Sequence, residues 1–469
     1  MPPLKCSMLS RITAVLLLIA ALLTPTLPAH AQDSTDLIET PVSFANGDRT
    51  IGGTIIAPAD SATDLPGLVL VAGAGPGPDR DRYREHAEAF ARAGIATLIY
   101  DKRGGEDGYS QFAASMDDLA GDAIAAAQTL RERPGVDPDL VGLHGHSEGA
   151  WVVIEAGARS DDVAFVIASG GSAFTPDRTQ QWMNRVQLYR LGVEDRFLDA
   201  LGSQLVSAIV AADMFRLAGH DPLPTLTEIE QPFLGVFSEH DLNTPPAQSL
   251  VSYREALEAG GHESYSLRVV PGVDHEMVLL DGSAIGAAYV ETVSSWVTDL
   301  AAGIQEVRVD EPPSQDLESS PAADVQWFGT WTAVLIALVL SVVLFGAYPV
   351  MALACKARGF APMESSRSAR LLAVLGLTVP VLAVVYLMMV MMVAGKSVFG
   401  PVLAGRPLPW LLLQLAALGI AAVAIAVVVQ ASKRWGDMDT GSKVRFGALV
   451  AGTVVVFVPW AAYWGLLIV

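Results

Sequence analysis

Cysteine and charge are both scarce in this sequence of 469 residues. The two cysteines are Cys6 and Cys355, and Cys6 lies in a segment that we expect to be removed, so the mature chain could form no internal disulfide. This excludes a disulfide scaffold and a zinc finger. Charged residues make up only 17% and hydrophobic residues 51%, a balance that indicates a chain with membrane spans.

The charges that are present are distributed unevenly. Residues 327–469 hold 10 Lys+Arg and 3 Asp+Glu, a net charge of +7, whereas residues 32–324 hold 18 and 47, a net charge of −29. Residues 32–324 are therefore suited to water, and residues 327–469 to a membrane. Because so acidic a globular region repels phosphate backbones, we expect no nucleic-acid partner.

The N-terminus has the parts of a secretory signal peptide. Lys5 and Arg11 supply a basic start, and Ile12–Leu23 is an apolar run without charge. Ala29-His30-Ala31 then ends in the small-x-small pattern of a cleavage site. The alternative is an uncleaved anchor, but the apolar run is shorter than the roughly 20 residues that a membrane span needs. We therefore expect residues 1–31 to be a signal peptide.

Four apolar stretches at the other end of the chain are each long enough to cross a bilayer as a helix. They cover residues 327–355, 371–394, 409–430 and 446–469. If the acidic region lies outside, the loops expected inside carry 8 Lys+Arg and the outer loop carries 2, as the positive-inside rule requires. We expect a multi-pass protein of the bacterial inner (cytoplasmic) membrane whose acidic region is periplasmic or extracellular.

These stretches contain no Asp, Glu, Lys, Arg or His, whereas ion and proton paths through membranes are marked by such groups. The bundle is therefore interpreted as an anchor or a docking surface and not as a transporter. Gln414 is its most polar group at mid-depth, and we expect it to form a hydrogen bond between helices.

Residues 32–302 alternate apolar strands with helices, which predicts a doubly wound, mainly parallel α/β sheet covered on both faces. Two antiparallel edge strands around Asn46-Gly47-Asp48 begin this region. Residues 174–231 are helical by pattern and interrupt the alternation, so we expect a lid there. The acidic, Pro- and Ser-rich residues 303–326 are interpreted as a solvated linker to an all-α region of four transmembrane helices, residues 327–469.

The sequence Gly145-His146-Ser147-Glu148-Gly149 is a G-x-S-x-G motif between a predicted strand and a predicted helix. In that context the turn exposes the serine hydroxyl at the edge of the sheet, and the small residues two positions before and after it let strand and helix approach closely. The alternative is an ordinary buried turn serine. We expect Ser147 to be a nucleophile.

A serine nucleophile needs a base and an acid that orients the base. His275 follows a predicted strand and precedes the last helix of the α/β region, which places it on a loop at the carboxyl edge of the sheet. Asp241 follows another buried strand and is the preferred acid, with Glu239 and Asp274 as rivals.

The pair His144 and His146 also suggests a metal site, but no third ligand is spaced nearby in the sequence, so we expect no metal.

Two backbone N–H groups are needed for the tetrahedral oxyanion. The amide of Glu148, the residue after the nucleophile, is one, and Ala74 in the loop Gly73-Ala74-Gly75-Pro76 is the preferred second. A phosphate-binding loop is the competing interpretation of this glycine-rich segment. It is disfavoured because no Gly-Lys-Ser/Thr follows and two prolines remove donors.

Together these motifs resemble the α/β-hydrolase family, in particular its secreted esterase and acylaminoacyl-peptidase-like branch. The resemblance spans residues 41–300 and rests on the elbow, on the order Ser147, Asp241, His275, and on the loops 73–81 and 100–104. It implies a serine hydrolase that needs no cofactor. Ala72 departs from the pattern, since many members have a histidine there, and Gly105-Glu106-Asp107 replaces the usual Gly-x-Ser.

The sequence thus predicts a membrane-anchored serine hydrolase that cleaves a small-molecule or lipid-like carboxylic ester through an acyl-enzyme. Ester hydrolysis is favoured over peptide hydrolysis, and a peptidase or acyltransferase of the same fold remains the alternative. A non-catalytic binding or scaffold membrane protein is the rival from another class. The substrate itself depends on the shape of the lid and the pocket.

Overall fold

The computed structural model describes residues 36–59, 64–74, 79–103, 115–194, 196–321, 325–359 and 366–467. The described residues from Leu37 onward belong to one compact unit. The predicted signal peptide lies outside the described residues, as do Gly75 and Pro76 of the predicted oxyanion loop and the Gly105-Glu106-Asp107 departure. The signal peptide and the complete oxyanion loop therefore remain predictions.

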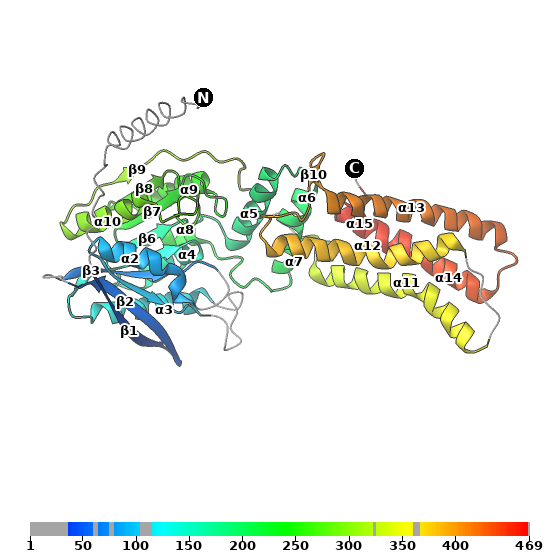
Figure 1. Cartoon of the computed structure of the whole chain (residues 1–469), viewed down its shortest axis with the longest axis horizontal. Helices are drawn as coiled ribbons and strands as arrows, with labels where there is room; N and C mark the ends of the chain where they lie inside the picture. The colour runs from blue at the N-terminus through cyan, green and yellow to red at the C-terminus, as the bar shows by residue number, and fades with distance from the viewer. Residues whose placement is uncertain are drawn as a thin grey trace, which may run out of the picture. The chain divides into compact units, whose positions relative to one another are not determined.

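Among the described residues, nine strands form one sheet in the order β1-β2-β4-β3-β5-β6-β7-β8-β9 (Figure 1). The pairs β1–β2 and β2–β4 are antiparallel and the other pairs are parallel. Gly47 has a positive φ of 62° in the β1–β2 turn, as the predicted hairpin requires. The strands are β1 (Leu37–Asn46), β2 (Arg49–Pro58), β3 (Leu65–Val71), β4 (Ala96–Tyr100), β5 (Val136–His146), β6 (Val166–Ser169), β7 (Phe233–Ser238), β8 (Tyr265–Val270) and β9 (Arg308–Val309).

Each face of the sheet has its own apolar core. One face packs against α3, α4 and α9 through side chains such as Leu119, Val152 and Leu257. The other packs against α2 and α10 through Phe90 and Val293. The mainly parallel sheet covered on both faces is therefore confirmed. The helices are α2 (Arg84–Arg92), preceded by the short helix η1 (Arg80–Tyr83), α3 (Met116–Arg131), α4 (Glu148–Arg159), α9 (Pro246–Ala259) and α10 (Ala287–Ala301).

The segment between β6 and β7 is helical and lies where a lid was predicted. Pro176 occupies the first turn of its longest helix, a position where the missing N–H costs nothing. Its second half breaks into short pieces, one of them a π-helical turn. The segment consists of α5 (Pro176–Arg190), α6 (Arg196–Asp199), η2 (Ala200–Leu205), α7 (Val206–Val210) and α8 (Pro222–Leu226).

Most described residues of the predicted linker are exposed, but its backbone is held against the α/β region. Its strand β9 pairs with β8 and extends the sheet. Further along, the Trp182 indole donates to the carbonyl of Leu317 over 2.7 Å, and the Arg178 guanidinium donates to the carbonyl of Ser319 over 2.7 Å. The Pro- and Ser-rich composition indicated an extended chain, and here the extended backbone finds its hydrogen-bond partners on the sheet and on α5.

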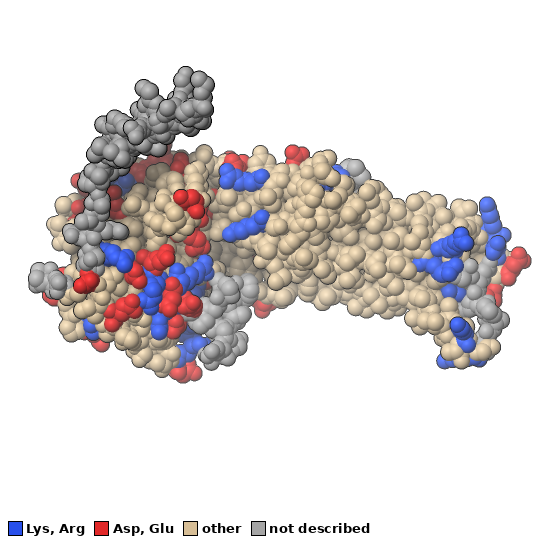
Figure 2. All heavy atoms as spheres, viewed as in Figure 1, with Lys and Arg blue, Asp and Glu red and all other residues tan. Residues whose placement is uncertain are grey.

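Within the described residues, four helices are long and apolar enough to cross a membrane. The fourth is continuous through a π-helical stretch. On the face seen in Figure 2 these helices are almost free of charge along their length, with Lys and Arg gathered at the end where α13 stops and α14 begins. The four are α11 (Trp331–Ala357), α12 (Arg367–Met392), α13 (Leu408–Arg434) and the run α14 (Thr440–Ala451), η4 (Gly452–Phe457) and α15 (Val458–Tyr463), with η3 (Trp327–Gly329) before α11 and the short hairpin β10 (Val402–Leu403) and β11 (Arg406–Pro407) before α13.

Two buried polar side chains of this bundle, Gln414 and Arg445, have hydrogen-bond partners. The Gln414 side chain donates over 2.9 Å to the carbonyl of Gly465, so the predicted hydrogen bond across the bundle forms, but with a partner just beyond the end of α15 and not on a helix. Arg445 was expected in the loop before the fourth apolar stretch. It lies instead inside α14, because this helix begins earlier than the apolar run. Its guanidinium is buried, donates to the carbonyl of Tyr348 over 3.1 Å and lies over that residue's ring.

Candidate active site

Ser147 occupies a sharp turn between β5 and α4. Its backbone has φ 56° and ψ −117°, a conformation that side-chain-bearing residues rarely adopt. The flanking glycines are there because nothing larger fits. A Cβ on Gly145 would lie 2.0 Å from the carbonyl oxygen of Gly149, and one on Gly149 would lie 2.2 Å from that of Val71. The structure therefore has the strained strand-turn-helix geometry that the motif needs.

His275 and Asp241 are in contact. Asp241 follows β7 and His275 follows β8, and because these strands are parallel neighbours their carboxyl ends meet at one edge of the sheet. His275 Nδ1 lies 2.7 Å from Asp241 Oδ2, and both side chains are buried. Asp241 Oδ1 accepts from the amides of Asn243 and Thr244, and Oδ2 also accepts from the Thr244 hydroxyl. The carboxylate is thus fixed in the orientation that holds the imidazole.

The surroundings of His275 favour its protonated form. Burial lowers the pKa of an imidazole, but the Asp241 charge and hydrogen bond outweigh it and raise the pKa of His275 above its usual value. An imidazolium that forms at this position is therefore stabilised, which is the property required of a general base.

Glu239 and Asp274, the alternative candidates for the acid, form hydrogen bonds that stabilise their own loops. Glu239 accepts a hydrogen bond from the amide of Gly272 over 3.2 Å. Asp274 accepts from the amides of Glu276 and Val278 and so closes a turn. The structure places neither against His275 Nδ1 and places Asp241 there.

The two predicted oxyanion donors lie beside the serine. Ala74 and Glu148 line the same cavity of about 320 Å³ as Ser147 and His275. Among the described residues, neither amide has a hydrogen-bond acceptor. Gly73 permits the close approach, because a Cβ there would lie 3.0 Å from the Ser147 Cβ.

The sequence did not reveal how this loop is held. The Lys102 ammonium donates to the carbonyls of Ala72 and Gly73, each over 3.0 Å, and contacts the Glu148 carboxylate. The hydroxyl of Tyr83 accepts from the Gly73 amide over 3.3 Å. Lys102 thus ties the loop to the start of α4 although Ala72 replaces the histidine found in many relatives. The sequence signal was the Lys-Arg pair after β4, to which no role was assigned.

His146 and Glu276 form a second polar group next to His275. His146 Nε2 lies 3.4 Å from Glu276 Oε2, and the Arg82 guanidinium lies 3.2 Å from Oε1. Burial lowers the pKa of His146. Burial would raise the pKa of Glu276, but His146, His275 and Arg82 outweigh it and hold that pKa well below its usual range.

Ligand atoms of His146, His275 and Glu276 lie within 4.8 Å of one another. The pair weighed from the sequence was His144 and His146; only His146 belongs to this cluster, and the loop after β8 supplies its other two members. A cation at this position would occupy a nitrogen of the proposed base. We therefore give the cluster no part in catalysis and expect a cation bound there to inhibit.

His144 faces away from this cluster, as expected for a strand-end side chain. Its Nε2 lies 2.6 Å from the Tyr289 hydroxyl and 2.9 Å from the Ser169 hydroxyl. Burial lowers the pKa of His144 to about 3, so the ring is neutral and acts in packing and hydrogen bonding.

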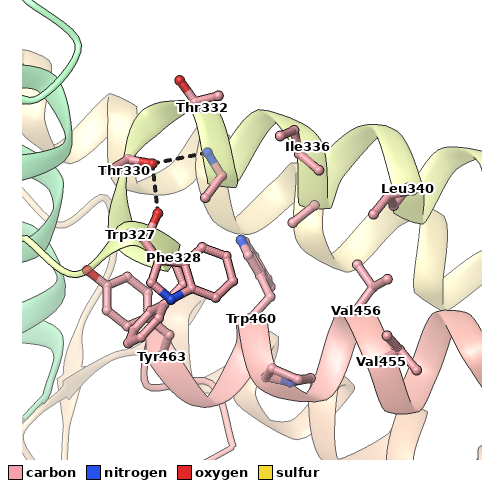
Figure 3. A pocket seen from close by; sticks show the side chains of 13 residues that line it. Trp327, Phe328, Thr330, Thr332, Ile336, Leu340, Val455, Val456, Trp460 and Tyr463 are labelled. Carbon is pink, nitrogen blue, oxygen red and sulfur yellow. Dashed lines mark hydrogen bonds between the residues drawn. The ribbon is translucent and has the colours of Figure 1, made fainter.

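A larger cavity of about 640 Å³ lies at one end of the bundle between α11 and α15 (Figure 3). Trp327, Phe328, Ile336, Trp460 and Tyr463 are among the side chains that line it. None of the predicted catalytic residues lines it, and its lining includes no carboxylate, lysine, arginine or histidine.

Comparison with known families gives one match, to the family described as "Serine aminopeptidase, S33", over residues 66–198. The matched segment includes the elbow serine and ends before Asp241 and His275. The comparison with curated proteins gave no significant match.

Several solved structures are similar to the α/β part. They include a dienelactone hydrolase from Anabaena variabilis (19% identity, 56% of this chain and 97% of that chain, TM-score 0.38). A bacterial brefeldin A esterase, described as a homologue of human hormone-sensitive lipase, is 20% identical over 64% of this chain and 89% of its own, with a TM-score of 0.43. The acylaminoacyl peptidase of Pyrococcus horikoshii is 19% identical over 60% of this chain and 43% of its own, with a TM-score of 0.40. The sheet order and the family match together establish the predicted α/β-hydrolase fold.

Proposed function

We propose that this chain is a membrane-anchored serine hydrolase that cleaves carboxylic esters with Ser147, His275 and Asp241. The observation that carries the proposal is the buried 2.7 Å contact between His275 and Asp241 at the cavity that the strained Ser147 also lines. A scaffold protein has no use for a serine held at a positive φ beside a histidine whose pKa is raised by a carboxylate.

In this proposal His275 takes the proton of the Ser147 hydroxyl as its oxygen attacks the ester carbonyl. The amides of Ala74 and Glu148 donate to the oxyanion that develops, and each is worth about 3 kcal/mol in the transition state. His275 then gives the proton to the departing alcohol, which leaves an acyl-enzyme. Water, activated by the same histidine, releases the acid and restores the serine.

Ester hydrolysis is favoured over aminopeptidase activity by the charges at the cavity. An aminopeptidase needs a carboxylate to hold the substrate's ammonium group. The two carboxylates that line this cavity already have cationic partners, Glu148 with Lys102 and Glu276 with Arg82. Apolar side chains, among them Trp151, Met183 and Phe215, also line the wall and suit an acyl or alkyl group.

The proposed arrangement along the chain is a signal peptide over residues 1–31, a hydrolase domain over residues 32–302 and four transmembrane helices over residues 327–469, joined by residues 303–326. The positive charges at one end of the bundle support an orientation with that end in the cytoplasm and the hydrolase domain in the periplasm.

The test of function is hydrolysis by the purified full chain. We expect release of p-nitrophenol from p-nitrophenyl esters of graded acyl length, and far slower release from aminoacyl-naphthylamides. Ser147→Ala should abolish turnover, while Ser295→Ala, a change at an exposed serine of α10, should leave it intact. Naphthylamide hydrolysis that exceeds ester hydrolysis would instead assign a peptidase.

A further inference from the structure

One wall of the catalytic cavity comes from the membrane region. Ala394 and Lys396, in the loop between α12 and α13, line the cavity together with Ser147 and His275. The second membrane helix of the bundle therefore ends beside the proposed nucleophile. A segment that only anchors the protein would not need to line the catalytic cavity.

The loop is held there by close packing against the lid. Gly395 has a φ of 74°, and a Cβ on it would lie 3.0 Å from the carbonyl oxygen of Asn184 on α5. The neighbouring residue Ala394 also has a positive φ, of 52°. On the other side, the Tyr386 hydroxyl donates to the carbonyl of Val398 over 2.8 Å. These contacts fix the backbone on both sides of Lys396.

The lid is attached to the same end of the bundle at a second point. The amide of Glu194 donates to the carbonyl of Gly405 over 2.8 Å. Phe197 is buried with its ring 5.0 Å from that of Trp410 and 5.9 Å from that of Tyr386. Lid and bundle thus share one apolar core, and the position of the loop relative to the cavity is a property of the fold.

Lys396 brings a positive charge to the rim of the cavity. Arg82 is paired with Glu276, and Glu148 is paired with Lys102. Among the described residues, no carboxylate forms an ion pair with the exposed Lys396 ammonium. A cation left without a partner at the rim of a cavity attracts a negatively charged ligand.

We propose that Lys396 is a specificity-determining residue that selects esters carrying an anionic group, a carboxylate or a phosphate, near the bond that is cleaved. The inference rests on the proposed function, since it names the substrate class of the same site. The apolar walls hold the hydrocarbon part of the substrate, and the membrane loop holds the anion.

The test compares two soluble esters with the same number of acyl carbons, the anionic p-nitrophenyl hemiglutarate and the neutral p-nitrophenyl valerate, with the full chain in detergent. Lys396→Met should lower the ratio of their kcat/KM values about three- to fivefold, the range expected for one partly exposed ion pair. The loss should appear mainly in KM for the anionic ester. Lys396→Arg should restore the preference, and high salt should weaken it in the wild type.

Lys433→Met is the matched control, because Lys433 lies at the other end of α13, about 40 Å of helix away. Phosphatidylglycerol vesicles form a second arm that distinguishes the sources of the anion. If fatty-acid release also falls with Lys396→Met, the anion is a lipid headgroup. If only the hemiglutarate responds, it is a soluble acid.

An unchanged ratio in Lys396→Met, or an equal loss in Lys433→Met, would overturn the proposal. A wild type that cleaves no ester would refute the proposed function and not the charge recognition. For that case, binding of hexylphosphonate to the Ser147→Ala variant is measured by calorimetry. Lys396→Met in that background should weaken it about three- to fivefold, and equal binding would refute the role of Lys396.

Discussion

Replacing Asp241 by asparagine should stop turnover through a specific error in the histidine. In the native site Oδ1 accepts from two backbone amides, those of Asn243 and Thr244, at 2.7 and 2.8 Å. An asparagine at this position keeps its oxygen on those donors and places its NH₂ where Oδ2 was, against His275 Nδ1. That nitrogen must then accept the hydrogen bond, so the proton moves to Nε2 and the ring can no longer take the proton of Ser147.

Two effects determine how far kcat should fall. The imidazolium loses its carboxylate and the neutral ring adopts the wrong tautomer, which in the serine-protease precedent costs about 10⁴-fold in kcat. We expect a loss of 10³- to 10⁴-fold in kcat for p-nitrophenyl esters, with little change in KM and an unchanged circular dichroism spectrum. Glu239→Gln and Asp274→Asn, whose carboxylates only shape their loops, should each cost less than about tenfold. If Glu239→Gln proves as damaging as Asp241→Asn, the acid has been misassigned.

Three further predictions concern pH, metals and topology. The kcat/KM value should rise with pH through one ionisation above the usual imidazole value of about 6.5, because only neutral His275 accepts the proton and Asp241 raises its pKa; a profile that falls through this range would contradict the assignment. Zn²⁺ should inhibit ester hydrolysis through His146, His275 and Glu276, and Glu276→Gln should weaken the inhibition; equal inhibition of both proteins would show that the cation binds elsewhere. The topology is tested in intact cells with single cysteines in a Cys355→Ser background. Cysteine at the exposed position Ser314 should react with an impermeant maleimide, whereas cysteine at Asp437 should react only after permeabilisation. The reverse pattern would invert the topology.

The core of the proposed site could be predicted because its signals are local in sequence. The elbow needs glycine two positions before and after the serine, and the acid and base each follow a recognisable buried strand. The same holds for the sheet and the four apolar helices, whose patterns extend over many residues. Alternation and apolar length are properties of single segments, so no knowledge of packing was needed.

The parts that the sequence did not reveal are contacts between distant segments. Lys102 braces carbonyls that lie about thirty positions earlier, and nothing in its neighbourhood indicates that it will turn toward them. Glu276 meets His146 only because β5 and the loop after β8 end at the same edge of the sheet. Lys396 lies beyond two of the long apolar helices, and its position at the cavity depends on the docking of the lid against the bundle.

The linker could be predicted only in part. Its acidic, proline-rich composition indicated exposure to solvent, and most of its described residues are exposed, but composition does not show that an extended backbone will pair with a sheet edge. The strand β9 and the hydrogen bonds from Trp182 and Arg178 place residues 308–319 on the α/β region. Nothing in the linker's own sequence signals partners that belong to β8 and α5.

The most direct test of the central claim is to find which residue an active-site-directed reagent modifies. The full chain is treated with a fluorophosphonate, digested and examined by mass spectrometry. We predict one stoichiometric adduct, on Ser147, that disappears in Ser147→Ala and is formed orders of magnitude more slowly in His275→Ala. An unmodified Ser147 in a folded protein, or an adduct on another serine that persists in Ser147→Ala, would contradict the claim that this chain is a serine hydrolase acting through Ser147.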